Sequence, residues 1–423
     1  MNRHMAREAP LPVDPALIET VRQSVLAQSG PVTELRVAAA VRDSGRLLGA
    51  AGSLAAMDRI SAELNGLGPL QNLVRDPDIT DIFVNAPDEV WLDRGSGPER
   101  ANVAFENEAS LRALAVRLIA SGGRRLDDGS PCVDVKLDAG YRVHAVLPPI
   151  SATGTLISIR IKRQEAFSLA ELQESGCIPA VMATILATMV AARLSFLISG
   201  ATGAGKTTLL SSLLGLCDPA ERLVLIEDAA ELDPDHPHAV TLEARHANTE
   251  GTGGIDLAEL VRQALRMNPG RLIVGECRGA EVRELLMALN TGHSGGGGTI
   301  HANSAADVPA RLAALGALAG LSNHAVALQA SSALDAVIHV DRRAGRRFIA
   351  QIGLVRADDD GIRVVPAVLV GPPPDEKGPL RVGRGPGWED LAARLGLDAG
   401  LVPSGGAPLR GTTSVPGGPA EAA

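Results

Sequence analysis

The sequence predicts an α/β protein with a parallel sheet core, preceded by an α+β domain and an appended N-terminal helical segment. Between residues 177 and 370, short apolar runs alternate with helical stretches, which is typical of a parallel sheet covered by helices. Between residues 67 and 163, β-branched runs surround one amphipathic helix, as in α+β domains. The predicted parts are a helical segment at 1–66, an α+β domain at 67–163, a polar linker at 164–176, the α/β core at 177–370 and a Pro- and Gly-rich tail at 371–423 that we expect to be disordered.

Helices dominate the first part, and strands dominate the second. Apolar residues recur at near-helical spacing after Asp14-Pro15, and Ser53 is suited to cap a second helix that ends near Leu64. In the α+β domain, one helix is expected at 108–120. The runs that favour strands there are 79–84, 90–92, 132–137, 141–147 and 155–161.

The core begins with a helical stretch at 177–193, which leads into an apolar strand at 194–199, a glycine loop and a second helix. Further strands are expected at 223–226 and 272–274, and further helices at 256–267 and 280–289. A strand pair at 348–355 and 362–370 ends the core. The tail carries one weak helical pattern, 388–397.

Composition and charge limit the function classes. The net charge is −9 and aromatic residues make up 2% of the chain, so the overall field does not attract nucleic acid and few rings are present to stack on bases. We therefore expect no direct nucleic-acid partner. The cysteines are far apart, which argues against a zinc cluster or a disulfide scaffold and fits a reducing cytoplasm. They are Cys132, Cys177, Cys217 and Cys277.

We expect no targeting sequence and no membrane span. Residues 1–12 are polar and lack the apolar stretch of a secretory signal. The most apolar run, 180–192, ends at Arg193 and is shorter than the roughly 18 to 20 residues that cross a bilayer. The expected location is the cytoplasm.

A glycine loop in the core carries a strong nucleotide-binding signature. It fits the pattern G-x-x-x-x-G-K-[ST] between an apolar strand and a helix. The backbone N–H groups of such a loop bind phosphate at a helix N-terminus, while Lys206 reaches the β- and γ-phosphates and the Thr207 hydroxyl binds Mg²⁺. The nucleotide contacts expected here are Gly200, Ala201, Thr202, Gly203, Ala204, Gly205, Lys206, Thr207 and Thr208.

Two acidic clusters follow apolar strands, at the strand ends where ligands bind in open α/β sheets. Glu276 directly follows the strand at 272–274, as expected of an acid that holds a metal ion or orients water. Glu231 lies in the cluster that also contains Glu227 and Asp228. Those two either orient Glu231 or line the site. The structural alternative for Glu231 and Glu276 is a solvated acid at the end of a strand.

Two histidines, His293 and His301, bracket four consecutive glycines, 295–298. Glycine is disfavoured inside strands and helices because it loses much backbone entropy, so we expect a flexible loop there. The histidines could contact a γ-phosphate, or they could be packed polar residues beneath the loop. Their spacing is not that of a helical zinc site, and we expect no metal other than magnesium.

Taken in order, these motifs resemble the type II/type IV secretion ATPases. The boxes are Ile198 to Thr208, Ile226 to Leu232, Leu265 to Pro269, Val274 to Glu276 with Arg278, and Asn290 to Asn303. The chain looks closest to the Tad pilus (CpaF-like) branch, and the resemblance extends from about Ser53 to Asp341.

The resemblance implies a homo-hexameric ring that binds ATP and Mg²⁺ between an N-terminal domain and a RecA-like P-loop ATPase core. In this family Glu231 would activate water, Thr207 and Glu276 would hold the metal, and His293 and His301 would form the histidine box. Two arginines in the strands of the N-terminal domain, Arg142 and Arg160, match those that the family brings to the phosphates. Arg278 could serve the site or form a structural ion pair.

One departure from the family concerns the histidine box. Many relatives carry an acid after the first histidine and bulkier residues before the second, whereas Ser294 and Gly295 to Gly298 stand here. The expectation is a more mobile loop.

Three functions are compatible with these residues. The first is an ATPase motor for Tad/Flp-type pilus assembly or type II/IV secretion, attached to the inner face of the membrane through inner-membrane platform proteins. The second is a RecA-like DNA translocase or helicase-type ATPase, which the negative net charge disfavours. The third is a scaffold that binds ATP with negligible turnover.

Overall fold

The computed structural model describes residues 20, 21, 24, 34–44, 66–95, 97–137, 140–161, 167–245, 252–343, 345–358, 361–371 and 378–404. The chain divides into two compact units, Met1–Arg163 and Gln164–Ala423. The helical patterns that begin at Asp14 and Ser53 lie mostly or wholly outside the described residues. Within the N-terminal segment, helix α2 spans Glu34–Asp43.

The first unit contains a six-stranded antiparallel sheet with the order β3-β2-β1-β6-β5-β4. The strands form where β-branched residues alternate with polar ones, so that one face of the sheet is buried. They are β1 (Asp81–Ala86), β2 (Glu89–Asp93), β3 (Pro98–Arg100), β4 (Cys132–Lys136), β5 (Tyr141–Val146) and β6 (Leu156–Ile161). Only β3 is absent from the strands expected from the sequence.

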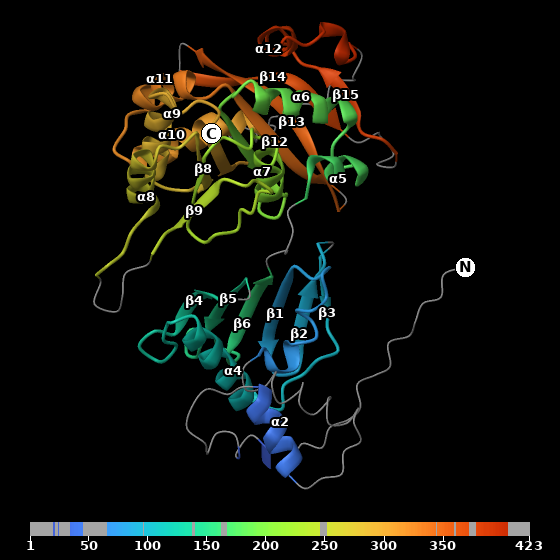
Figure 1. The fold of residues 1–423 in the computed structure, drawn as a ribbon, viewed down its shortest axis with the longest axis vertical. Helices are drawn as coiled ribbons and strands as arrows, with labels where there is room; N and C mark the ends of the chain where they lie inside the picture. The colour runs from blue at the N-terminus through green and yellow to red at the C-terminus, as the bar shows by residue number, and fades with distance from the viewer. Residues whose placement is uncertain are drawn as a thin grey trace, which may run out of the picture. The chain divides into compact units, whose positions relative to one another are not determined.

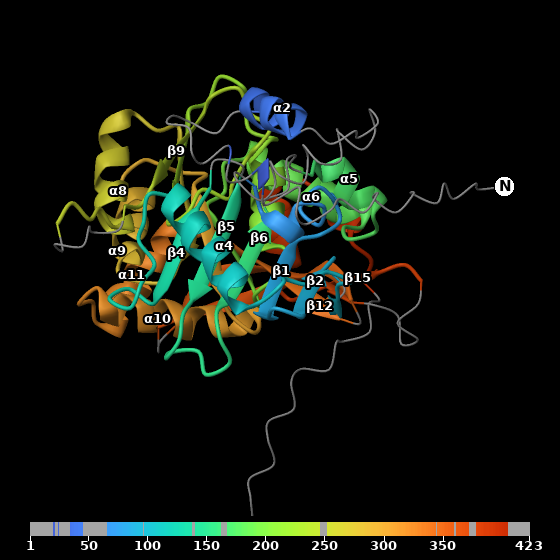
Figure 2. The ribbon, with the colours of Figure 1, turned by 90° about the horizontal axis from the view of Figure 1, so that it is seen from below.

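Helix α4 (Glu108–Ser121) supplies the layer that covers this sheet. It begins where the Asn107 side chain accepts the N–H of Ser110, and its apolar side chains pack into one cluster with the buried strand residues. In Figure 2 the helix lies across the strands of the first unit. The unit is therefore a two-layer α+β domain, as the sequence predicts.

The second unit is built on a nine-stranded sheet with the order β15-β14-β13-β12-β7-β11-β10-β8-β9. Strands β12, β7, β11, β10, β8 and β9 run parallel, and β13, β14 and β15 extend the sheet antiparallel. The parallel strands are β7 (Phe196–Gly200), β8 (Leu223–Glu227), β9 (Ala239–Glu243), β10 (Arg271–Cys277), β11 (Gly297–His301) and β12 (Ala336–Arg343). The antiparallel ones are β13 (Arg346–Asp358), β14 (Gly361–Gly371) and β15 (Arg381–Arg384).

Helices cover both faces of this sheet, which is why its central strands are apolar on both sides (Figure 1). One cluster contains α5 (Leu169–Glu174), α6 (Ala180–Ala191), α7 (Lys206–Leu214) and α12 (Trp388–Leu395). The other contains α8 (Leu257–Ala264), α9 (Glu281–Asn290), α10 (Val308–Leu318) and α11 (Asn323–Ala333). The prediction of a parallel α/β core is confirmed.

The polar segment 164–176, expected to be a linker, contains helix α5. Ser168 accepts the N–H of Glu171 while the Glu171 carboxylate accepts that of Ser168, which is a complete capping box. Leu169 is buried in the core of the second unit. The helix escapes a periodicity search because it is short, but Ser-x-x-Glu is the signal that could have found it.

The tail, expected to be disordered from residue 371, is ordered between 378 and 404. Strand β15 pairs with β14, α12 follows, and a short 3-10 turn, Ala399–Leu401, closes the segment. Trp388 is 1% exposed and its Nε1–H donates to the Ala399 carbonyl oxygen at 2.8 Å. Its burial, with that of Leu391 and Leu395, fastens a Pro- and Gly-rich segment to the sheet.

The four glycines at 295–298 do not form the flexible loop that their composition suggests. Gly297 and Gly298 lie inside β11, between β10 and β7 in the middle of the sheet, and both are buried. A Cβ on Gly297 would overlap the Phe196 carbonyl oxygen, and one on Gly298 would overlap that of Val274. The close approach of the neighbouring strands requires glycine, and it outweighs the entropic cost of glycine in a strand.

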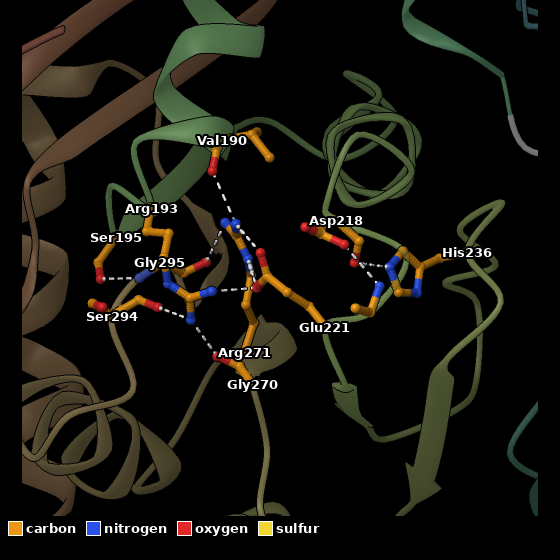
Figure 3. A network of polar contacts seen from close by, with 11 residues as sticks. Val190, Arg193, Ser195, Asp218, Glu221, His236, Gly270, Arg271, Ser294 and Gly295 are labelled. Carbon is orange, nitrogen blue, oxygen red and sulfur yellow. Dashed lines mark hydrogen bonds and ion pairs between the residues drawn. The ribbon is translucent and has the colours of Figure 1, made fainter.

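A network of charges around the buried Arg271 joins the starting ends of the central strands (Figure 3). Both oxygens of Glu221 accept hydrogen bonds from Arg271, at 2.7 and 2.9 Å, and Arg193 also pairs with Glu221. The bonds from Arg271 lower the pKa of Glu221. The two arginines also donate to backbone carbonyls, Arg193 to that of Ser294 and Arg271 to that of Gly295. The segment that enters β11 is thus fixed by two guanidinium groups.

Among the described residues, no single helix is long and apolar enough to cross a membrane, although the bent pair Ala305–Leu318 and Asn323–Ala333 meets that test by length and composition alone.

Replacing Gly297 by alanine tests the close packing of β11. The added methyl group has to displace the backbone of β7, and we expect a loss of about 3 kcal/mol or more in the free energy of unfolding, measured by urea denaturation. Gly215→Ala is the control, because that glycine has negative φ and its added Cβ would make only ordinary contacts. Equal stability of the two variants would contradict this packing.

Replacing Trp388 tests whether the ordered part of the tail belongs to the cooperative fold. Trp388→Ala leaves a large cavity against the sheet and should cost about 3–5 kcal/mol. Trp388→Phe keeps much of the volume and should cost less. A thermal midpoint that Trp388→Ala leaves unchanged would place the segment outside the folded unit.

Candidate nucleotide-binding site

The glycine loop lies where a parallel strand hands over to a helix, at the carboxyl edge of the sheet. β7 ends at Gly200 and α7 begins at Lys206. Gly203 and Gly205 have φ of 72° and 100°, values that L side chains rarely adopt. Gly200 lies so close to β12 that a Cβ would stand 2.5 Å from the Val340 carbonyl oxygen. The glycines therefore set both the bend of the loop and its distance from the next strand.

Lys206 is buried and its ammonium group is turned into the loop. Nζ donates to the Ala201 carbonyl oxygen at 3.0 Å and to Nδ1 of His301 at 3.2 Å. Burial lowers the pKa of Lys206, and the negative charges of Glu276 and Glu231 oppose that shift. The ammonium group has three N–H donors, and these contacts use two of them.

His301 connects Lys206 to Glu276. It ends β11 beside Gly200, and its Nε2 lies 3.1 Å from Oε1 of Glu276 at the end of β10. Because Nδ1 accepts from Lys206, the ring proton is on Nε2 and is donated to the carboxylate. The structure thus brings together three residues expected from the sequence, in a chain of lysine, histidine and glutamate.

Glu227 holds the segment that carries Glu231. Its Oε1 accepts the backbone N–H groups of Glu231 and Leu232 at 3.0 and 2.9 Å, and its side chain is 4% exposed. Gly275 leaves the room for it, since a Cβ there would be 2.7 Å from Cγ of Glu227. Of the two roles left open by the sequence, Glu227 has the orienting one.

Two other candidates have structural partners. Asp228 forms an ion pair with Arg278, as in the structural alternative for that arginine. His293 lies before β11. The Nδ1–H of His293 donates to the Ala288 carbonyl oxygen at 3.1 Å. The nearby Gly295 N–H donates to Ser195 Oγ, at the start of β7. Since β11 alone spans roughly 13 Å at about 3.3 Å per residue, the structure does not bring His293 to the glycine loop.

Arg142 and Arg160 belong to the first unit and are direct cross-strand partners on β5 and β6. Lys136 on β4 pairs with Arg142, so three cations stand in one row across the sheet. This row alternates with buried Val143 and Ile159, which face α4, and so lies on the opposite face. Arg160 Nε donates to Asp81 at 3.2 Å. Lys136 and Arg160 are exposed, and Arg142 is half-buried.

The residues around the loop fit a nucleotide with Mg²⁺. Thr207 stands in the first turn of α7 and offers a hydroxyl, and Glu276 offers a carboxylate that is 42% exposed. Magnesium at a phosphate site needs only one or two protein oxygens, because phosphate and water supply the rest. In the described residues no three His, Cys, Asp or Glu side chains form a metal-binding group. A metal here would depend on the bound phosphates.

A residue that sequence reasoning missed also touches the loop. Arg347, on β13, donates from Nε to the Gly203 carbonyl oxygen at 3.0 Å. It lies 144 positions further along the chain, and only the pairing of β12 with β7 and β13 brings it there. No local sequence signal marks it.

Comparison with known proteins identifies the family of this chain. Residues 63–350 match the family model described as "Type II/IV secretion system protein". The chain belongs to this family. Its parallel sheet, with the glycine loop after β7, is the RecA-like core that the motifs implied.

Proteins similar to this chain come from several bacteria. The candidate conjugal transfer protein Rv3659c of Mycobacterium tuberculosis (strain ATCC 25618 / H37Rv) is 48% identical over 326 residues, which are 75% of this chain and 93% of that protein. The type IV secretion system protein PtlH of Bordetella pertussis is 33% identical over 297 residues, which are 64% of this chain and 87% of that protein. Among solved structures, the VirB11 ATPase of Brucella suis in complex with sulphate is 25% identical over 69% of this chain and 96% of that one, with a TM-score of 0.36.

His339 on β12 contacts Ser199 of β7, just before the glycine loop, and its burial predicts a pH dependence of stability. Its Nδ1 lies 2.9 Å from Ser199 Oγ, and burial lowers its pKa from the ordinary 6.5. As the pH falls through 6.5, the unfolded chain takes up a proton that the folded chain does not, so the free energy of unfolding falls. Urea denaturation between pH 7.5 and 5.5 should show a smaller decrease for His339→Asn than for the unchanged chain. Equal slopes would contradict this role.

Proposed function

We propose that this protein is an ATP-hydrolysing motor of the type II/IV secretion class, which works as a homo-hexameric ring at the inner face of the membrane. The observation that carries the proposal is the chain of Lys206, His301 and Glu276 at a phosphate loop, in a protein of this family. Attachment to the membrane would come from inner-membrane platform proteins. ATP is the substrate, and Mg²⁺ the metal.

Each site residue then has a defined task in hydrolysis. The loop amides and Lys206 bind the β- and γ-phosphates, and Thr207 and Glu276 would hold Mg²⁺, which supplies charge neutralisation when bound. Glu231, held by Glu227, accepts the proton of the water that attacks the γ-phosphorus as the bond to ADP breaks. His301, at the end of β11, lies where it can sense the γ-phosphate.

Two arginines of the first unit complete this proposal. Arg142 and Arg160 would place positive charge on the phosphate oxygens while the transferred group carries its greatest negative charge, a contribution of about 10³ to 10⁵ in rate for other arginine fingers. Arg160 would have to exchange its bond to Asp81 for the phosphate. His293, by contrast, donates from Nδ1–H to the Ala288 carbonyl oxygen on α9.

The machine that the motor drives is proposed from the relatives. One is named for conjugal transfer and another for type IV secretion, which supports a type IV role. The Tad/Flp-type pilus is the other candidate machine, on the motif resemblance alone. In each, changes between ATP-bound and ADP-bound states would move the ring and its partners.

The decisive experiment measures ATP hydrolysis together with sedimentation mass, with and without ATP. Glu231→Gln should bind ATP but lose about 10² to 10⁴ in kcat, and Lys206→Ala should lose nucleotide binding. Glu174→Gln, an exposed acid on α5, is the matched control and should hydrolyse normally.

Other outcomes decide against the motor. Normal turnover by Lys206→Ala would remove it, and ATP binding with no phosphate release would favour the scaffold. Turnover that rises several-fold with added DNA would favour the DNA translocase.

A further inference from the structure

The hairpin of β12 and β13 forms one wall of the phosphate loop. Gly200 lies against the Val340 carbonyl of β12, and the side chain of Arg347 on β13 extends along the other end of the loop. Cδ of Arg347 would be 3.6 Å from a Cβ on Gly205, and its Nε donates to the Gly203 carbonyl oxygen at 3.0 Å. The aliphatic part of the Arg347 side chain therefore packs against Gly205, and its guanidinium group binds the Gly203 carbonyl oxygen.

This contact fixes the orientation of one peptide group. In a trans peptide the C=O and the following N–H point in opposite directions. The Gly203 carbonyl points to Arg347, and the next N–H, that of Ala204, donates back to the Ala201 carbonyl oxygen at 3.3 Å. The Gly203–Ala204 peptide is thus held at both ends.

The same peptide is linked to the lysine. The Ala201 carbonyl oxygen accepts from Ala204 and also from Nζ of Lys206. A loop without the Arg347 contact could rotate the Gly203–Ala204 peptide easily, since Gly203 has φ of 72° and carries no side chain to resist. Rotation would release the Ala201 carbonyl and with it the position of Lys206.

We propose that Arg347 is a positioning residue that holds the phosphate loop in its binding conformation before nucleotide arrives. The proposal rests on the proposed nucleotide-binding function. A binding-competent loop that is only partly populated lowers the apparent affinity by the populated fraction. Loss of Arg347 therefore weakens nucleotide binding, whereas the groups that perform the chemistry stay in place once the nucleotide is bound.

Arg346 provides a matched control on the same strand. It is also half-buried, and its guanidinium donates to the carbonyl oxygens of Gly378 at 2.7 Å and of Gly176 at 3.0 Å. These contacts are with the segment between α5 and α6 and with the approach to β15. Removing them should affect the stability of the hairpin without touching the phosphate loop.

The experiment uses the full chain and titrates Mg²⁺-ADP, followed by steady-state ATP hydrolysis. Arg347→Met keeps the stem over Gly205 and removes the donor, and we expect both Kd for ADP and KM for ATP to rise about tenfold with kcat changed less than about threefold. Arg347→Lys restores a donor and should recover most of the affinity. Arg346→Met should bind ADP as the unchanged chain does.

The possible results separate this inference from the proposed function. ADP binding by Arg347→Met at normal affinity would overturn it, as would an equal loss in Arg346→Met or a fall in kcat with KM unchanged. If Arg347→Met does not fold, judged by its thermal midpoint, Arg347→Leu, which also lacks a donor, replaces it with the same expectation. An unchanged chain that binds no ADP would overturn the proposed function itself.

Discussion

The second unit depends on one steric constraint, which is the insertion of β11, a strand that begins with two glycines, between β10 and β7. At Gly296, Gly297 and Gly298 a Cβ would overlap the carbonyl oxygens of the neighbouring backbone. The register that results sets His301 beside Gly200 and Ile300 beside Cys277. The histidine that contacts Lys206 and Glu276 is therefore placed by backbone packing several residues away from it, and any slip of β11 by one residue would turn His301 to the other face.

The starting edge of the sheet supplies the opposing anchor. Arg271 is 1% exposed, and a guanidinium so deeply buried is costly unless it is fully paired. Glu221 receives it through two hydrogen bonds, and the remaining donors hold the Val190 and Gly295 carbonyls. Arg193 also donates to the Ser294 carbonyl oxygen, so charged side chains fix the start of β11. Lys206 and Glu276 fix its last residue, His301. His293 lies at the entry, and this explains why a histidine box that is compact in sequence is divided in space.

Sequence reasoning reached the site wherever chemistry is local. Strand, glycine and helix patterns in the sequence mark the loop from Gly200 to Thr208 and the acid Glu276, which the structure places at the end of β10. His301 links Lys206 to Glu276 there. Sequence reasoning failed where contacts with residues far away in the sequence decide the local structure. Four consecutive glycines predict a flexible loop, but here neighbouring strands pack directly against them. A Pro- and Gly-rich tail predicts disorder, but here Trp388 is buried in the core of the second unit. Arg347 has no local signal at all, because its partner lies on another strand.

Other protein groups hold both the lysine and one carbonyl oxygen of the phosphate loop. Lys206 is bonded to Ala201 and His301, and Gly203 to Arg347. A phosphate can displace the first two, because its charge offers the ammonium group a stronger acceptor than a carbonyl or an imidazole. A phosphate does not compete for the contact between Arg347 and Gly203, because the Gly203 group involved is a carbonyl oxygen, which is an acceptor like the phosphate itself. Lys206, His301 and Glu276 thus form a hydrogen-bonded chain from the phosphate loop to β10, while Arg347 holds the frame of the loop separately.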